Sequence, residues 1–174
     1  NHSDLFNKTR VAIYTFNKSL SAYISCLAPR IGTADGEAGS GIDVTVTNFH
    51  KWAWHFLQER GVENLHRTIS GTSQVGLITR AITQVERTNE NARMLDKSKE
   101  FFQEEISWIK GKILNTMEEY LDEKRVGRGT SERVTREDKK TLWAVHENYN
   151  ELLKTLRHLD FDDYALLALN AIEN

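Results

Sequence analysis

The sequence of 174 residues has one cysteine, one proline and little net charge. Because Cys26 has no second cysteine to pair with, the chain cannot hold an intramolecular disulfide or a zinc site built from several cysteines. The net charge of −2 argues against binding of nucleic acid through overall charge. No apolar run approaches the roughly 20 residues that a membrane-spanning helix needs, so we expect no membrane span.

Catalytic and metal-binding patterns are also missing from the sequence. We find no Ser/His/Asp array, no Cys/His pair, no paired-carboxylate signature and no phosphate-binding glycine loop. His146 and His158 are 12 residues apart, which on one helix would turn them to different faces, so we expect no metal site. We therefore predict a protein that is not an enzyme and that needs no cofactor.

The chain begins with Asn1 rather than methionine. We interpret it as a fragment that lacks its native N-terminus, in which targeting information at that end would be lost. The lone cysteine favours a reducing compartment, and we expect a soluble, cytoplasmic protein.

The longest stretch with a helical pattern is Ser73–Lys124, which contains no proline and only two glycines, Gly76 and Gly111. As one helix it would be roughly 78 Å long at about 1.5 Å per residue. Its apolar pattern fades at Thr88–Asn91 and again at Asp96–Lys99. We favour two helices, Ser73–Leu95 with Ser73 as its cap and Ser98–Lys124, folded into a hairpin near one of these gaps. An unbroken rod, which would require an oligomer, remains the alternative.

Apolar residues at helical spacing predict further helices on either side of this stretch. Thr135 to Asp138 resembles a capping box, and the seam that follows has strict four-three spacing. The predicted helices are Ser3–Leu27, Val44–Arg60 with a short extended start before an Asn48 cap, Val62–Ser70, a long helix carrying the seam Leu142 to Leu159, and a last helix from Asp162 or Asp163.

We therefore predict one all-α domain over 1–174. It would be an up-and-down helical bundle of four to five main helices plus short additional helices, with flexible loops at about 28–43 and 125–135. Gly61 suits the residue that follows a helix, and Pro29 is expected to stop the first one.

The second loop and its flanks are basic. Two glycines and several hydroxyl groups near Arg128 would let the backbone approach a phosphate, although no aromatic residue is interleaved for base stacking. The candidate phosphate-binding or nucleic-acid-binding residues are Arg125, Arg128, Arg133, Arg136, Lys139 and Lys140, within the basic loop 124–140.

The run from His66 to Gly76 resembles the phosphorylatable segment of histidine phosphotransfer domains. In that family a Gly-rich, Ser-containing stretch follows the histidine, and an apolar–glycine pair, here Val75-Gly76, opens the next helix. The resemblance implies a helical bundle with His66 as an exposed phospho-acceptor. Ile69 and Ser70 stand where the family has a lysine and a glycine, so the groups that help to receive the phosphoryl group are missing.

Apolar helical seams are plentiful, whereas catalytic constellations are absent. Trp54 lies on the opposite face of its predicted helix from Phe56 and is a candidate exposed aromatic contact. The leading hypothesis is a non-enzymatic module for protein–protein interaction or self-assembly that binds a protein partner, or forms a homo-oligomer, through such a seam.

Overall fold

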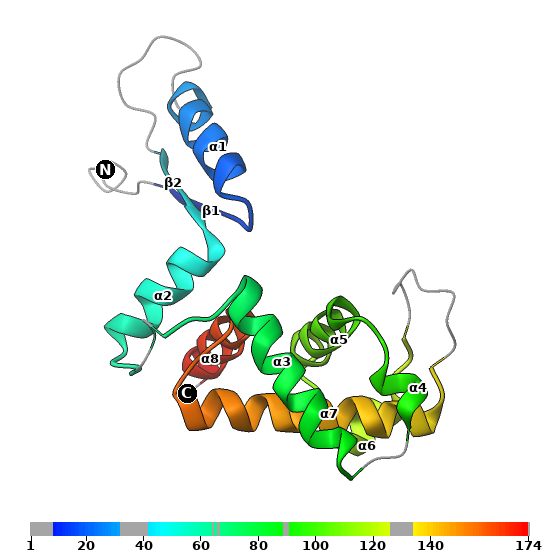
Figure 1. Cartoon of the computed structure of the whole chain (residues 1–174). Coiled ribbons are helices and arrows are strands. Elements are labelled where there is room, and N and C mark those ends of the chain that lie inside the picture. The colour runs from blue at the N-terminus through cyan, green and yellow to red at the C-terminus, as the bar shows by residue number, and fades with distance from the viewer. Residues whose placement is uncertain are drawn as a thin grey trace, which may run out of the picture. The chain divides into compact units, whose positions relative to one another are not determined.

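The computed structural model of the chain describes residues 9–31, 42–63, 65, 67–88, 91–125 and 134–173. Over these residues the fold is mainly helical, with one small parallel sheet of two strands (Figure 1). The expectation of an all-α fold is corrected by this sheet. Contacts divide the chain into two compact units, unit 1 (Asn1–Arg60) and unit 2 (Gly61–Asn174), which we describe one at a time. The single domain expected over 1–174 stays a prediction.

Unit 1 is a β-α-β arrangement followed by a helix. The two strands run parallel in an unbroken register from Thr9 opposite Ile42 to Thr15 opposite Asn48, and the first helix packs mainly on the second strand. The elements are β1 (Thr9–Thr15), α1 (Lys18–Ile31), β2 (Ile42–Asn48) and α2 (Phe49–Glu59).

The helix expected over Ser3–Leu27 is wrong across β1. Val, Ile, Thr and Tyr in Thr9–Thr15 favour an extended chain, and pairing with β2 satisfies its backbone. The helix begins only at Lys18, after Asn17 accepts a hydrogen bond of 2.8 Å from the backbone N–H of Ser19. Pro29 does not stop it, because α1 continues to Ile31 with the proline in its last turn.

Both ends of α2 confirm the sequence signals. The Asn48 side chain accepts hydrogen bonds from the backbone N–H groups of His50 and Lys51, which caps the helix where the strand ends. Gly61 follows the helix with φ of +73°, a conformation that costs glycine little.

The loop expected at 28–43 is shorter, since 28–31 are helical and 42–43 belong to β2. The residues between them lie outside the described part of the chain.

Unit 2 holds six helices among its described residues. The helix expected over Val62–Ser70 is wrong for the described residues there, because this segment is extended or turned and Ile69 N–H donates to the carbonyl of Leu159 at 2.8 Å. The helices are α3 (Gly71–Glu86), α4 (Ala92–Leu95), α5 (Lys99–Gly111), α6 (Met117–Asp122), α7 (Arg136–Leu156) and α8 (Phe161–Glu173).

The stretch 73–124 is therefore not a single rod. The chain leaves the helical conformation at both polar gaps, and Ser98 caps α5 by accepting a hydrogen bond from Phe101 N–H. A further break that the sequence did not predict follows Gly111, where Ile113 takes φ of 56°. The two long helices expected over Ser73–Leu95 and Ser98–Lys124 are each divided, and α3 begins at Gly71 rather than after a Ser73 cap.

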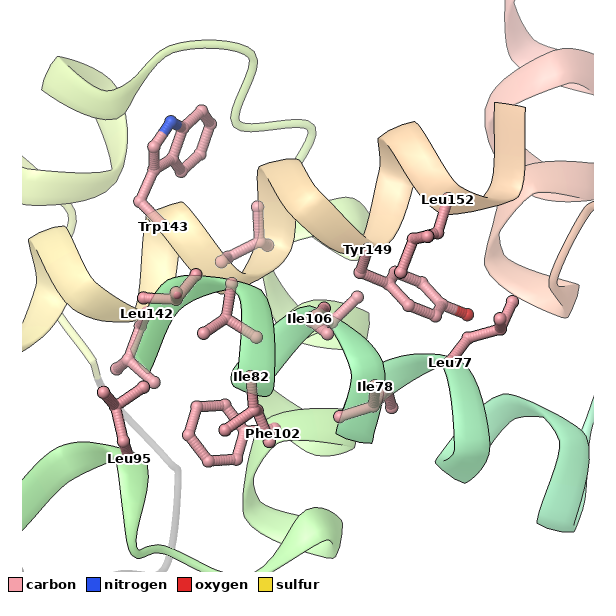
Figure 2. Close-up of a cluster of buried hydrophobic side chains, with 14 of the residues drawn as sticks. Leu77, Ile78, Ile82, Leu95, Phe102, Ile106, Leu142, Trp143, Tyr149 and Leu152 are labelled. Carbon is pink, nitrogen blue, oxygen red and sulfur yellow. The ribbon is translucent and has the colours of Figure 1, made fainter. Parts of the chain in front are cut away.

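The core of unit 2 lies mainly between α3, α5 and α7. Figure 2 shows Ile82 of α3 on the side of Leu142 of α7, and Ile78 of α3 further along, on the side of Ile106 of α5. Trp143 lies on the other side of α7 from Leu142 (Figure 2). Of the seam predicted from Leu142 to Leu159, the part up to Leu152 is buried in this core, as are Phe102 and Ile109. Leu156 is half-buried, and Leu159 lies beyond the end of α7.

The capping box at Thr135 is confirmed, because its hydroxyl accepts from Asp138 N–H while the Asp138 carboxylate accepts from Thr135 N–H at 2.8 Å. No helix in the described ranges is long and apolar enough to cross a bilayer.

Candidate interaction surface and ligand groove

An aromatic row lies on the surface of unit 1. We use this name for Phe16, Phe49, Trp52 and Phe56, whose neighbouring ring centroids are 5.4, 5.8 and 5.2 Å apart in that order. The three members in α2 recur at steps of three and four residues, so they share one helical face. Tyr14 packs edge-on against Trp52 at 5.2 Å, and the row therefore joins the end of β1 to α2.

None of these rings is fully buried. Phe16 is 77% exposed and Tyr14 is 47% exposed, while Phe49, Trp52 and Phe56 are half-buried. The guanidinium of Arg60 lies 4.7 Å from the centre of the Phe56 ring. Aromatic residues and arginine are the types most enriched in the cores of protein–protein interfaces.

Other apolar side chains of unit 1 are exposed as well. Val11, Leu20 and Tyr23 are 39%, 47% and 63% exposed, on β1 and α1. Parallel sheets are usually covered by helices on both faces, and two strands alone are marginally stable. In the described part of unit 1, β1 exposes most of its side chains.

Trp54 does not belong to the aromatic row. It is half-buried and packs edge-on against His55, with ring centroids 4.9 Å apart. Its role as an exposed aromatic contact stays a prediction.

Four of the candidate basic residues are engaged within unit 2. Arg125 pairs with the buried carboxylate of Glu105, and Arg136 lies 3.0 Å from Asp122. The ammonium of Lys139 donates to three backbone carbonyls at the end of α6, at 2.6 to 3.0 Å, and burial lowers its pKa. Lys140 pairs with Glu137 at 2.9 Å.

Arg128, Arg133 and His66 lie outside the described residues. Phosphate or nucleic-acid binding at the loop, and phosphotransfer at His66, stay predictions.

Unit 2 has a groove of about 770 Å³ between the end of α5, the segment after it, α7 and α8. Its apolar lining comes from Ile113, Leu114, Trp143, Leu153, Leu159, Leu166 and Leu167. Its polar lining comes from Lys110, Asn115, His146, Glu147, Asn150, Glu151, Lys154, His158 and Asp163.

A buried ionic cluster closes one side of this groove. The ammonium of Lys110 lies 2.7 Å from carboxylate oxygens of both Asp160 and Asp163, and the Tyr149 hydroxyl donates to Asp160 at 2.9 Å. Burial alone would raise the pKa of Asp160, but the Lys110 ammonium beside it lowers that pKa below the ordinary value. The same cluster starts α8, because Asp160 accepts from the Asp163 N–H at 3.0 Å.

His146 is the most deeply buried polar side chain of the groove after this cluster. Its residue is 7% exposed, its ring lies 4.9 Å from that of Trp143, and Nε2 lies 2.9 Å from the amide nitrogen of Asn150. Burial, with a contribution from the Lys110 charge, lowers the pKa of His146 to about 4. The imidazole is therefore neutral near pH 7.

His146 and His158 both line the groove because α7 ends at Leu156. Arg157 takes a left-handed conformation with φ of 53°, and His158 follows in the turn before α8. The prediction that a 12-residue spacing turns them to different faces holds for one continuous helix, and α7 does not continue to His158. The start of the last helix at Asp160 to Asp163 is the sequence signal for this turn, because it requires α7 to end before Asp160.

The described residues define a mainly helical protein with a surface aromatic row in one unit and a groove in the other. Comparison of the chain with protein families, curated proteins and solved structures gave no match. No group of three or more metal-ligating side chains among the described residues is arranged to hold a metal ion.

Proposed function

We propose that the chain is a non-enzymatic interaction module that self-associates through the aromatic row of unit 1. The observation that carries this proposal is the continuous row of rings from Phe16 to Phe56, none of which is fully buried. Water contact with this much aromatic surface is unfavourable, at about 25 cal/mol for each Å². Covering it would favour association.

A second copy of the chain suits this surface because a two-fold axis lets the same patch contact itself. The row carries few charges, so two copies would approach without strong repulsion. Tyr14, which packs against Trp52 and is 47% exposed, would extend the same contact area.

This surface differs from the one that the sequence suggested. The seam of α7 and the apolar face of α3 pack into the core of unit 2 and are not available for a partner. Five of the eight exposed large hydrophobic side chains in the described ranges lie in unit 1, which moves the proposed interface there.

The up-and-down bundle is retained as a proposal for unit 2 alone, where it would serve as a rigid scaffold. Its support is that α3, α5 and α7 contribute to one core. An experimental structure in which neighbouring helices of this core alternate in direction would support it, and helices that cross at steep angles would contradict it.

The test is sedimentation of the full chain over a range of concentrations up to millimolar, with Phe16→Lys as the main variant. Phe16 is 77% exposed, so this change leaves the folded unit intact. We expect the wild type to form a dimer and Phe16→Lys to weaken it by at least about tenfold.

Phe161→Lys is the matched control, since Phe161 is an exposed phenylalanine of unit 2. It should dimerise like the wild type. A wild type that stays monomeric at the highest concentration, or a Phe16→Lys variant that associates as strongly as the control, would contradict the proposal.

A further inference from the structure

The groove of unit 2 has the size and lining of a small-molecule site. Pockets that bind small molecules measure about 300–1,000 Å³ and are mostly apolar with a few placed polar groups. The groove has a volume of about 770 Å³, and its apolar lining includes Trp143 and Leu153 of α7 together with Leu166 and Leu167 of α8. Such a lining suits the apolar body of a ligand, and the polar groups around it determine which ligand fits.

Two carboxylates at this groove have no partner. Glu147 and Glu151 line it from α7, and because they are four residues apart they lie on the same face of the helix. Both side chains are exposed, and neither carboxylate forms a hydrogen bond or an ion pair with another described residue. An ionised carboxylate only accepts hydrogen bonds, so this pair suits a ligand that donates them and carries positive charge.

The other charged groups at the groove do not offset this pair. The ammonium of Lys110 lies 2.7 Å from carboxylate oxygens of both Asp160 and Asp163, so it offers no positive charge to a ligand. The His146 imidazole is neutral near pH 7, because burial lowers its pKa to about 4. Lys154 is the other lysine of the lining, and one ammonium against two carboxylates leaves an excess of negative charge. The groove therefore attracts cations and disfavours anions.

We propose that the groove binds a small organic cation, an amine whose protonated nitrogen lies against the carboxylates of Glu147 and Glu151 and whose apolar body packs against the groove leucines. Both carboxylates are exposed, so the ammonium group reaches them without being buried. Removal of the apolar body from water contributes about 25 cal/mol for each Å² and adds to the charge attraction. This inference concerns unit 2 and does not depend on the proposed self-association.

The probes are three naphthalene compounds with the same apolar body and different charges. Naphthylethylamine is a cation near neutral pH, naphthylacetamide is uncharged and naphthylacetate is an anion. Each is titrated into the isotope-labelled full chain, and the indole N–H signals of the tryptophans are followed by NMR. We expect saturable binding of the amine, with weaker binding of the amide and the weakest binding of the acid.

The tryptophan signals also locate the probe. All four tryptophans are in the described ranges, and of these Trp143 lines the groove, whereas Trp52 belongs to the aromatic row. The amine should therefore shift the indole signal of Trp143 and leave that of Trp52 in place.

Glu147→Gln/Glu151→Gln tests the two carboxylates. Both positions are exposed, so we expect the variant to fold. It should bind the amine about fivefold more weakly, the combined value of two exposed ion pairs, and should bind the amide like the wild type. A higher salt concentration should likewise weaken the amine and not the amide.

Glu100→Gln/Glu118→Gln is the matched control. It removes the same charge from two exposed glutamates of unit 2 that do not line the groove, and it should bind the amine like the wild type.

Four outcomes would overturn the proposal. They are the absence of saturable binding of the amine, binding of the acid at least as tight as that of the amine, equal affinity of the two double variants for the amine, and a shift of Trp52 in place of Trp143. A Trp143 signal that moves with protein concentration alone would mean that a second copy of the chain occupies the groove, and it would overturn the proposal as well.

Discussion

His146 shows how one buried side chain can make the stability of the fold depend on pH. The residue is 7% exposed, and burial lowers the pKa of its imidazole from 6.5 to about 4. Between these two values the unfolded chain binds a proton that the folded chain does not bind. The free energy of unfolding therefore falls as the pH is lowered through this window.

We predict that this residue removes on the order of 3 kcal/mol of stability between about pH 7 and about pH 4. His146→Phe lacks the titration and should lose less stability over the same range. Urea unfolding at both pH values measures the difference. Asp163, whose pKa burial raises, acts in the opposite direction but is common to both proteins.

His55→Phe is the control for this measurement because His55 is exposed. Its stability should depend on pH as that of the wild type does. Equal pH dependence in His146→Phe and the wild type would show that the imidazole is not held neutral by burial.

Ile113 is a second residue whose conformation depends on its surroundings more than on its residue type. It is 47% exposed with φ of 56°, a conformation that a β-branched side chain adopts at a cost. It follows the end of α5 at the rim of the groove, and nothing in its residue type signals a turn. The division of the expected helix Ser98–Lys124 was therefore not predictable from the residue at the break.

At the scale of elements, helix starts were predictable because their signals are local. Asn48, Ser98 and Thr135 each place a side-chain oxygen next to backbone N–H groups within three residues and cap a helix. The caps at Asn48 and Thr135 and a helix start at Ser98 were predicted, whereas the predicted cap at Ser73 was wrong because α3 begins at Gly71. The strand β1 was missed because its backbone partner, Ile42–Asn48, lies far along the chain. The β-branched residues of both segments favour a strand, whereas the helix predicted over Ser3–Leu27 rested on apolar spacing.

The groove was missed for a related reason. Its residues come from α5, α7 and α8, which only tertiary packing brings together. Spacing within one helix, the criterion applied to the histidines, cannot find such a site. The aromatic row was partly visible, since Phe49, Trp52 and Phe56 share a helical face, but the contribution of Phe16 depends on the strand that precedes it.

The ionic cluster joins three elements, because Lys110 of α5 contacts Asp160 and Asp163 at the start of α8, while Tyr149 of α7 donates to Asp160. The Lys110 side chain is 4% exposed and that of Asp160 is 1% exposed. Lys110→Met would leave two carboxylates without their counter-charge. We predict a loss of about 3–5 kcal/mol in the free energy of unfolding.

Lys112→Met is the matched control two residues further along. Lys112 is 51% exposed and pairs with Glu123 at 3.1 Å, and exposed pairs contribute at most about 1 kcal/mol. Chemical denaturation of both variants gives the comparison. Similar losses in the two variants would mean that the buried cluster does not hold α5 to α8.

At the scale of the whole molecule, the two units differ in how much they bury. Of the hydrophobic residues described in unit 1, only Ala53 and Leu57 are buried, whereas unit 2 has a core of large side chains. Burial of apolar area is the main stabilising contribution to folding. We therefore predict that unit 1 unfolds at a lower urea concentration than unit 2.

The four tryptophans make this prediction measurable, since Trp52 and Trp54 lie in unit 1 while Trp108 and Trp143 lie in unit 2. A Trp52→Phe/Trp54→Phe variant reports on unit 2, and a Trp108→Phe/Trp143→Phe variant reports on unit 1. Circular dichroism of each variant controls for loss of structure. The emission of unit 1 should change at a lower urea concentration than that of unit 2. Only the unit 1 transition should move to higher urea as the protein concentration rises, because association through the aromatic row stabilises the unit that forms the interface. Coincident transitions in the two variants would mean that the units unfold as one cooperative body.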